Sequence, residues 1–141
     1  MADNLTPEQR IVAMRGVKSK NTSAEIAVRK LCHELGRSGY RLHRKDIPGK
    51  PDIAFIGLRA VIFVHGCFWH GHDCPAGAKK PKTNSAYWRA KIKRNKLRDA
   101  KHLAALDAAS WHSLLIWECE IRQPENVKLR IAGFLAAIVR T

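Results

Sequence analysis

The segment from residue 65 to residue 74 concentrates side chains that bind metals or transfer protons. It contains two cysteines, three histidines and one aspartate, together with the adjacent aromatics Phe68 and Trp69. Thiolates and imidazoles are ligands for zinc, and an imidazole also exchanges a proton near neutral pH. Packing alone rarely needs such a density of these groups. The segment therefore predicts metal binding, proton transfer or contact with a nucleic-acid base.

Three of these residues and one distant cysteine form a candidate zinc site. Cys67, His72 and Cys74 lie close together in the sequence, and Cys119 follows an apolar segment much further along. Three cysteines and one histidine are a usual ligand shell for structural zinc. The alternative is that they are buried thiols and a surface histidine. The combined set favours zinc, whereas Cys32, on the apolar face of an expected helix, is interpreted as core.

A second constellation combines a carboxylate with two histidines. Asp52 follows a turn and opens an apolar segment, where it could face a hard cation such as Mg2+. A plain turn aspartate is the alternative. If residues 52–56 and 60–64 form a hairpin around Gly57, Asp52 comes near His65 and His70. Carboxylate, metal and base are the components of phosphodiester hydrolysis.

Two further acidic residues have open roles. Asp99 lies in the basic segment 91–101 and could pair with Lys96 or Arg98, or could orient a catalytic histidine. Glu25 fits a capping box that starts at Thr22, yet it could also face the active site.

The charge of the chain predicts a polyanionic partner. Lysine and arginine number 26 against 12 acidic residues, which gives a net charge of +14 over 141 residues. The charge does not distinguish DNA from RNA or from an anionic membrane. No segment reaches the roughly 18 apolar residues of a membrane span, and residues 1–10 lack an apolar signal region. We therefore expect a cytoplasmic protein whose cysteines are metal ligands or free thiols.

Aromatic residues alternate with basic residues around the ligand-rich loop. Phe68 and Trp69 could wedge between base steps or stack on an unpaired base, and Trp88 lies at the start of the basic helix. Basic side chains nearby could contact phosphates, although such runs are often solvated surfaces. These are Lys79, Lys80, Lys82, Arg89, Lys91, Lys93, Arg94 and Lys96. Trp111 and Trp117 are expected in the core.

Hydrophobic periodicity predicts the elements that position these groups. We expect a helix over 22–35, a short strand at 40–42, a hairpin over 52–64, a long helix over 85–109 and a strand over 113–117. A closing helix would bury one apolar face. That face consists of Val127, Ile131, Phe134, Leu135 and Ile138. The order predicts an α/β sandwich with a mixed central sheet.

Taken together, these residues resemble the very-short-patch repair endonucleases, the Vsr family, over about residues 14–119. The most specific string is His-Gly-Cys-Phe-Trp-His at 65–70. The other matching pieces are Met14-Arg15, Asn21-Thr22 to Glu25, Pro48 to Asp52, His72 to Cys74, Tyr87-Trp88, Asp99 and Trp117 to Cys119.

The resemblance implies a fold and an activity. The fold would be a restriction-endonuclease-like, three-layer α/β/α core with a mixed central sheet and a structural zinc site. Residues 1–141 would be one endonuclease domain, with 1–21 a basic DNA-contacting segment and 22–141 the nuclease core. The enzyme would use Mg2+ to nick double-stranded DNA 5′ of the thymine in a T:G mismatch. Such mismatches arise from deaminated 5-methylcytosine, which implies a link to a cytosine-5 methyltransferase and to downstream repair proteins.

The resemblance also implies residue roles. Asp52 and the backbone carbonyl of Val64 would bind Mg2+, and His70 would be the general base. Asp99 would position His70, with His65 and Glu25 near the active site. The zinc ligands would be Cys67, His72, Cys74 and Cys119, and the residues inserted beside the mismatch would be Met14, Phe68, Trp69 and Trp88. The asymmetric task of cutting one strand favours a monomer.

Two positions depart from related patterns. Nucleases of this fold usually carry an acidic residue and a lysine where this chain has Phe63 and His65, so catalysis would depend on His70. Val64 stands where threonine is expected, which a backbone ligand tolerates. Two other readings stay open: a non-catalytic, zinc-stabilised nucleic-acid-binding module, and a nuclease of the same fold with another substrate.

Overall fold

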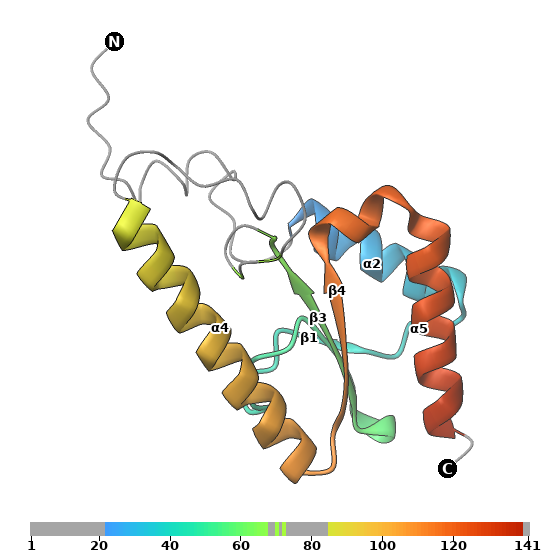
Figure 1. Ribbon diagram of the computed structural model, residues 1–141. Coiled ribbons are helices and arrows are strands. Elements are labelled where there is room, and N and C mark those ends of the chain that lie inside the picture. Colours follow the sequence, from blue (N-terminus) through green and yellow to red (C-terminus); the bar gives the residue numbers. More distant parts are fainter. Residues whose placement is uncertain (1–21, 68–69, 71, 73–84, 140–141) are drawn as a thin grey trace.

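The computed structural model describes residues 22–67, 70, 72 and 85–139 and shows a central sheet between helices (Figure 1). Every element expected within these ranges is present. In chain order they are α2 (Ser23–Glu34), β1 (Arg41–Leu42), β2 (Ile53–Phe55), the 3-10 turn η1 (Ile56–Leu58), β3 (Ala60–His65), α4 (Ser85–Ala108), β4 (His112–Trp117), the 3-10 turn η2 (Glu118–Arg122) and α5 (Pro124–Val139).

The sheet has four strands in the order β1-β2-β3-β4. The first three are antiparallel neighbours, which confirms the hairpin around Gly57. β4 runs parallel to β3, and His65 lies opposite Trp117. A parallel pair needs a crossover connection, and α4 lies in that connection. The sheet is therefore mixed, as expected, and the ligand-rich segment leaves β3 beside the end of β4.

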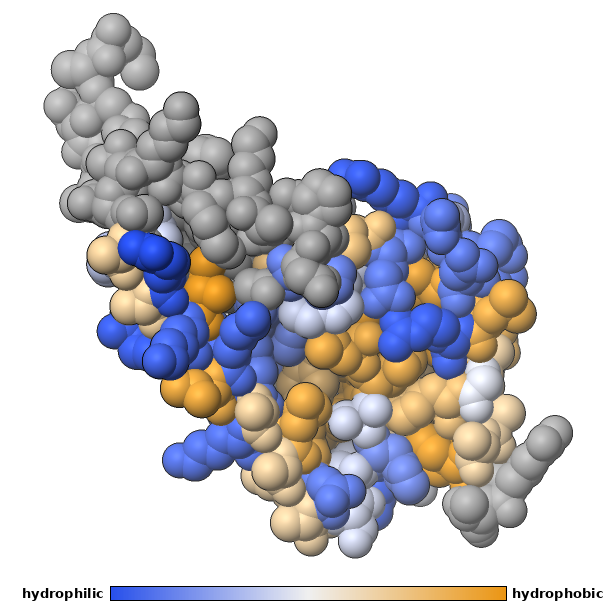
Figure 2. Space-filling view, in the orientation of Figure 1, coloured by the Kyte–Doolittle hydropathy of each residue, from blue (hydrophilic) through white to orange (hydrophobic). Residues whose placement is uncertain are grey.

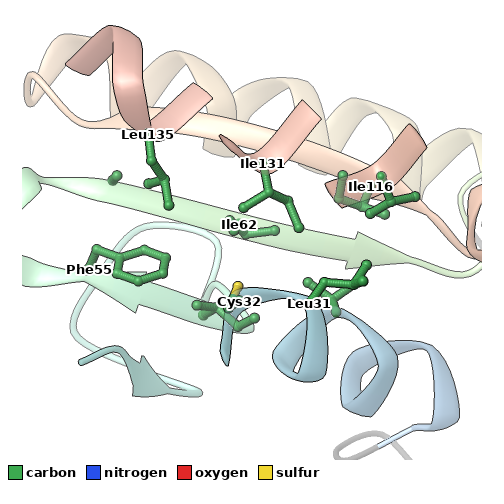
Figure 3. Packing of buried hydrophobic residues seen from close by; sticks show 11 residues of the cluster. Leu31, Cys32, Phe55, Ile62, Ile116, Ile131 and Leu135 are labelled. Atoms are coloured by element: carbon green, nitrogen blue, oxygen red, sulfur yellow. The ribbon is translucent and has the colours of Figure 1, made fainter. Parts of the chain in front are cut away.

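The helices cover the two faces of the sheet unequally. α2 and α5 lie on one face and α4 lies on the other (Figure 1). On the first face, the helices bury Val28, Leu31, Cys32, Val127, Ile131 and Leu135 against the strands (Figure 3). Three residues of the predicted α5 face, Val127, Ile131 and Leu135, are thus fully buried, and Phe134 and Ile138 pack at the edge. Burial also raises the pKa of the Cys32 thiol to about 11, consistent with its role in the core.

The second face packs a smaller cluster under α4. Leu106 of α4 belongs to one buried cluster with Val61 and Phe63, which alternate with Ile62 along β3. Gly49 joins this cluster to the loop before β2. A Cβ there would lie 3.0 Å from the Phe63 ring and 3.1 Å from His102, and the φ of +81° also favours glycine. The turn at 46–50 is therefore held close to α4, and Phe63 serves packing, not chemistry.

The ends of α2 follow local sequence signals. The Thr22 hydroxyl accepts a hydrogen bond from the Glu25 amide at 3.2 Å, so the predicted cap is confirmed. Gly36 adopts a φ of +74° just beyond the helix.

None of the helices in the described part of the chain has the length and apolar character that a membrane span requires.

Candidate active site

A cleft of about 1370 Å³ opens between the start of α2, the turn at 46–50, the end of β3 and the middle of α4. Six residues expected at the active site line it: Glu25, Asp52, Val64, His65, His70 and Asp99. Basic side chains of Lys45, Lys50 and Arg98 lie in its wall and are exposed. An acidic interior with exposed cations around it suits a divalent metal and a phosphate.

Asp52 is held at the edge of the sheet by a strand neighbour. Its Oδ2 accepts a hydrogen bond from the Val64 amide at 2.6 Å. Burial is the largest influence on this carboxyl and, with the nearby Glu25, raises its pKa to about 7, although the bond from Val64 opposes the shift. A bound cation would relieve this penalty by supplying the opposite charge. The group is thus poised to exchange a proton for a metal ion.

Glu25 faces the same part of the cleft, in agreement with the active-site position expected for it. The residue is only 3% exposed although it lies in the first turn of α2. Its Oε2 accepts hydrogen bonds from Arg29 at 3.3 Å and from His43 at 3.1 Å. Glu25, His43 and Asp52 offer ligand atoms within 4.8 Å of one another. Position 25 therefore serves both the helix start, through its amide, and the cleft, through its carboxylate.

His70 and Asp99 form a short hydrogen-bonded pair on the opposite wall. The His70 Nδ1 lies 2.5 Å from Asp99 Oδ2. Burial raises the pKa of Asp99, but the hydrogen bond and charge of His70 outweigh it, and the net pKa is lowered. An ionised Asp99 accepts the Nδ1 hydrogen, so Nε2 becomes the nitrogen that can take a proton. Of the two roles open to Asp99, the structure shows pairing with the histidine.

His65 stacks on His70 and shares the same carboxylate at longer range. The two rings are 3.8 Å apart and inclined by 10°, and His65 Nδ1 lies 3.9 Å from Asp99 Oδ2. That nitrogen is buried and has no hydrogen-bond partner among the described residues. Burial above all, with repulsion from His70 and Arg98, lowers the pKa of His65 to about 4, despite the opposing charge of Asp99. His65 is neutral at physiological pH.

Acid should destabilise the fold through His65. The unfolded histidine binds a proton below about pH 6.5, whereas the folded one resists it down to about pH 4. Stability contributed by neutral His65 is thus complete above pH 6.5 and is lost as the pH falls toward 4. Asp52 acts in the opposite sense because its raised pKa makes the folded state retain a proton.

Urea unfolding of variants at several pH values tests these two opposite effects of pH on the stability of the fold. His65→Gln should flatten the loss of unfolding free energy between pH 7 and pH 4.5, and Asp52→Asn should steepen it. The difference between variant and wild type reports the replaced side chain together with its charge interactions with neighbours such as His70 and Asp99. An unchanged slope for His65→Gln would mean that folding does not lower the pKa of His65.

Three of the four expected zinc ligands lie together. The ligand atoms of Cys67, His72 and Cys119 are within 4.8 Å of one another, and His72 Nδ1 is 3.5 Å from Cys119 Sγ. Ligand bonds of about 2.0–2.3 Å would let one zinc ion reach all three. Cys74, the fourth expected ligand, lies outside the described residues. The donor set therefore fits a zinc site between the end of β3 and the end of β4.

Trp117 and His43 belong to the site although sequence reasoning did not place them there. Trp117 was expected in the core, but its ring stacks on His72 at 4.1 Å and meets His65 and His70 edge-on. It thus joins the zinc ligands to the histidine pair. His43, whose ring contacts Glu25, is not among the residues that the sequence predicts for the site. The register of the strands could have indicated both residues, because each lies at the end of a strand beside a residue of the site.

The structure does not present Trp88 on the surface, which corrects the expectation of an exposed wedge. Its side chain is 2% exposed and packs at the start of α4 against Tyr87. Insertion beside a base pair would first require this side chain to leave its packing, so that role stays a prediction. Trp111 is half-buried under the Arg59 guanidinium. Met14, Phe68, Trp69, Lys79, Lys80 and Lys82 lie outside the described residues.

The outer face of α4 carries the expected basic surface. Hydrophilic residues gather over the N-terminal half of this helix, at the left of Figure 2. The exposed cations along the helix as a whole are Arg89, Lys93, Arg94, Lys96, Arg98 and Lys101. Asp99 turns away from this group toward His70, while Arg98 reaches the cleft wall. The helix can therefore contact phosphates and build the site at once.

Comparison with known proteins agrees with this geometry. The family model described as DNA mismatch endonuclease Vsr matches residues 2–76. The type II nicking enzyme V.XorIIP of Xanthomonas oryzae pv. oryzae is 47% identical over 135 residues, which cover 96% of this chain and 98% of the relative. The type II nicking enzyme V.NmeAIP of Neisseria meningitidis is 38% identical, over 93% of this chain and 92% of the relative.

A third relative, the DNA mismatch endonuclease Vsr of Escherichia coli, is 35% identical over 90% of this chain and 80% of its own length. All three matches include the strands and helices that form the cleft. With the carboxylates and the histidine pair in one cleft, the matches lead to one conclusion: the chain belongs to the Vsr family of DNA mismatch endonucleases and is a hydrolase that acts on DNA.

Proposed function

We propose that this endonuclease nicks double-stranded DNA on the 5′ side of the thymine in a T:G mismatch, with Mg2+ at the carboxylates. The observation that carries the proposal is the cleft itself, which joins the Glu25–Asp52 carboxylates to the His70–Asp99 pair. The first pair suits a hard cation and the second suits proton transfer. A binding module would need neither arrangement.

Two protein oxygens are proposed to hold the catalytic metal: a carboxylate oxygen of Asp52 and the backbone carbonyl of Val64. Oxygen donors, and a buried Asp52 carboxyl whose pKa is raised in the absence of a cation, fit Mg2+. When bound, Mg2+ would neutralise the scissile phosphate and stabilise the charge on the leaving oxygen.

The chain's own residues orient and deprotonate the attacking water. Asp99 fixes the His70 ring through Nδ1, so that Nε2 accepts a proton from water as its oxygen attacks phosphorus. The P–O bond to the leaving deoxyribose oxygen breaks, and that oxygen takes a proton from solvent. His65, neutral and stacked on His70, adds no charge that would oppose protonation of the base.

Recognition of the mismatch is assigned to segments around the cleft. Met14, Phe68 and Trp69 are proposed to insert beside the mismatched pair, and the α4 cations to contact phosphates. The substrate links the enzyme to a cytosine-5 methyltransferase, whose product gives T:G on deamination, and to repair proteins that act on the nick. Cutting one strand needs one active site, so we propose that the enzyme works as a monomer in the cytoplasm.

A strand-specific nicking assay tests the proposal. A labelled duplex with one T:G pair at a methylation-type site should be cut only in the thymine strand and only with Mg2+. Matched T:A and C:G duplexes and EDTA are the controls. Asp52→Asn should abolish the nick yet bind the duplex, because the amide preserves shape but cannot supply the charge that the cation needs.

The other outcomes identify the alternative readings. Tight binding by the wild type without a nick in any sequence context would indicate a nucleic-acid-binding module. Equal cutting of matched and mismatched DNA would indicate a nuclease with another substrate.

A further inference from the structure

His43 lies between Glu25 and Asp52, the two neighbouring acidic residues of the cleft. It follows β1, and its amide donates to the backbone carbonyl of Asp52 at 3.3 Å, which extends the β1–β2 ladder by one pair. Its side chain crosses to α2, where Nε2 lies 3.1 Å from Glu25 Oε2. One residue thus contacts Asp52 through the backbone and Glu25 through the side chain.

The backbone of His43 takes an uncommon conformation to make both contacts. Its φ is +49°, in the left-handed region that non-glycine residues seldom occupy. Such conformations persist where the surrounding structure requires them, and they cluster at functional sites. Without the left-handed turn, the chain would continue along β1 and the side chain would follow the strand's alternation.

Glu25 has little freedom once these contacts are made. Its Oε2 receives both the His43 ring and the Arg29 guanidinium, and its side chain is 4% exposed. The three possible ligand atoms of Glu25, His43 and Asp52 lie within 4.8 Å. Two carboxylates at this separation repel each other when ionised, so an unanchored Glu25 would turn away.

The hydrogen bond indicates what His43 does in this cluster. His43 Nε2 is engaged by Glu25, so His43 acts on a cation through the carboxylate. Partners that orient a ligating carboxylate in this way are part of many metal sites. We propose that His43 is a positioning residue that holds Glu25 against Asp52 and so completes the divalent-cation site. The inference rests on the proposed metal-dependent function.

Two substitutions separate the side-chain contact from the backbone turn. Asparagine tolerates the left-handed conformation but is too short to reach Glu25 as Nε2 does. Glutamine carries an N–H at the position of the distal ring nitrogen. Binding of Mn2+, which prefers the same oxygen ligands as Mg2+, is measured on the full chain by the electron paramagnetic resonance signal of the free ion.

We expect His43→Asn to weaken Mn2+ binding and metal-dependent nicking by about 10–100-fold, with DNA binding in EDTA unchanged. His43→Gln should recover most of the loss. His33→Ala is the matched control, because His33 also makes a histidine hydrogen bond, to Tyr40, but lies on the exposed side of α2. Its Mn2+ affinity should equal that of the wild type.

The outcomes distinguish this inference from the proposed function. If the wild type binds Mn2+ and Asp52→Ala does not, while His43→Asn binds normally, the inference is wrong and the function stands. Equal loss in His43→Asn and His43→Gln, with both variants folded and melting normally, would also overturn it. If wild type and Asp52→Ala bind Mn2+ equally, Asp52 does not hold the cation. That result would overturn the proposed metal-dependent function, and with it the role of His43.

Discussion

His70→Ala is expected to slow nicking by roughly 10²–10⁴-fold, because it removes the group that takes the proton from water. Asp99→Ala should cause a loss in the same range. Without the 2.5 Å bond to Oδ2, the His70 ring can rotate and its proton can shift to Nε2, the nitrogen that must be empty. Both variants should bind mismatched DNA as the wild type does.

Single-turnover nicking of the T:G duplex measures these losses. If His70 and Asp99 act as one unit, the double variant should be no slower than the slower single variant. Asp107→Ala is the control, since Asp107 is an exposed aspartate near the end of the same helix and lies outside the cleft. Additive losses would show that Asp99 contributes independently of His70, and an unimpaired His70→Ala would exclude His70 as the base.

Cys119→Ala is expected to remove zinc and leave the chain largely unfolded. Apparent binding free energies for structural zinc are about 10–16 kcal/mol in small peptides, which is comparable with the roughly 5–15 kcal/mol stability of a whole domain. The proposed site ties Cys67 and His72, beyond β3, to Cys119, beyond β4. Its loss would release the segment that carries His70 as well.

Zinc content and thermal unfolding by circular dichroism test this expectation. Cys32→Ala is the matched control: it removes a thiol from the core between α2 and the sheet, and it should lower Tm modestly with zinc unchanged. A Cys119→Ala protein that retains the wild-type Tm, or a wild type indifferent to a strong chelator, would show that the cluster is not a structural zinc site.

The elements of the fold could be predicted from sequence because their signals are local. α2, with Thr22 at its start and Gly36 after its end, follows capping chemistry. The hairpin follows two apolar segments around Gly57, and the buried face of α5 follows helical periodicity. In the site, the placement of Asp52 beside β3 followed from the hairpin alone.

The remaining features depend on contacts between distant segments. Nothing local indicates that Glu25 turns from its helix start toward His43, or that His43 adopts a positive φ as a non-glycine residue. Trp88, expected to contact DNA, is buried, and Trp117, expected in the core, stacks on His72 in the site. Neither outcome follows from the local sequence, because burial of an aromatic ring depends on which elements pack over it. Only the parallel register of β3 and β4 brings Trp117 to the histidines.

The parallel pairing of β3 with β4 also governs when the site can form as the chain folds. The β2–β3 hairpin closes through neighbouring residues, whereas β4 can pair with β3 only after a long segment containing α4 has crossed the sheet. Contacts between distant residues require this loss of chain entropy first and therefore form slowly. Asp52 and its Val64 bond can form early in the hairpin, whereas Cys119 reaches Cys67 and His72 only when β4 is in place. We therefore expect the cluster of Cys67, His72 and Cys119 to assemble later in folding than the contact between Asp52 and Val64.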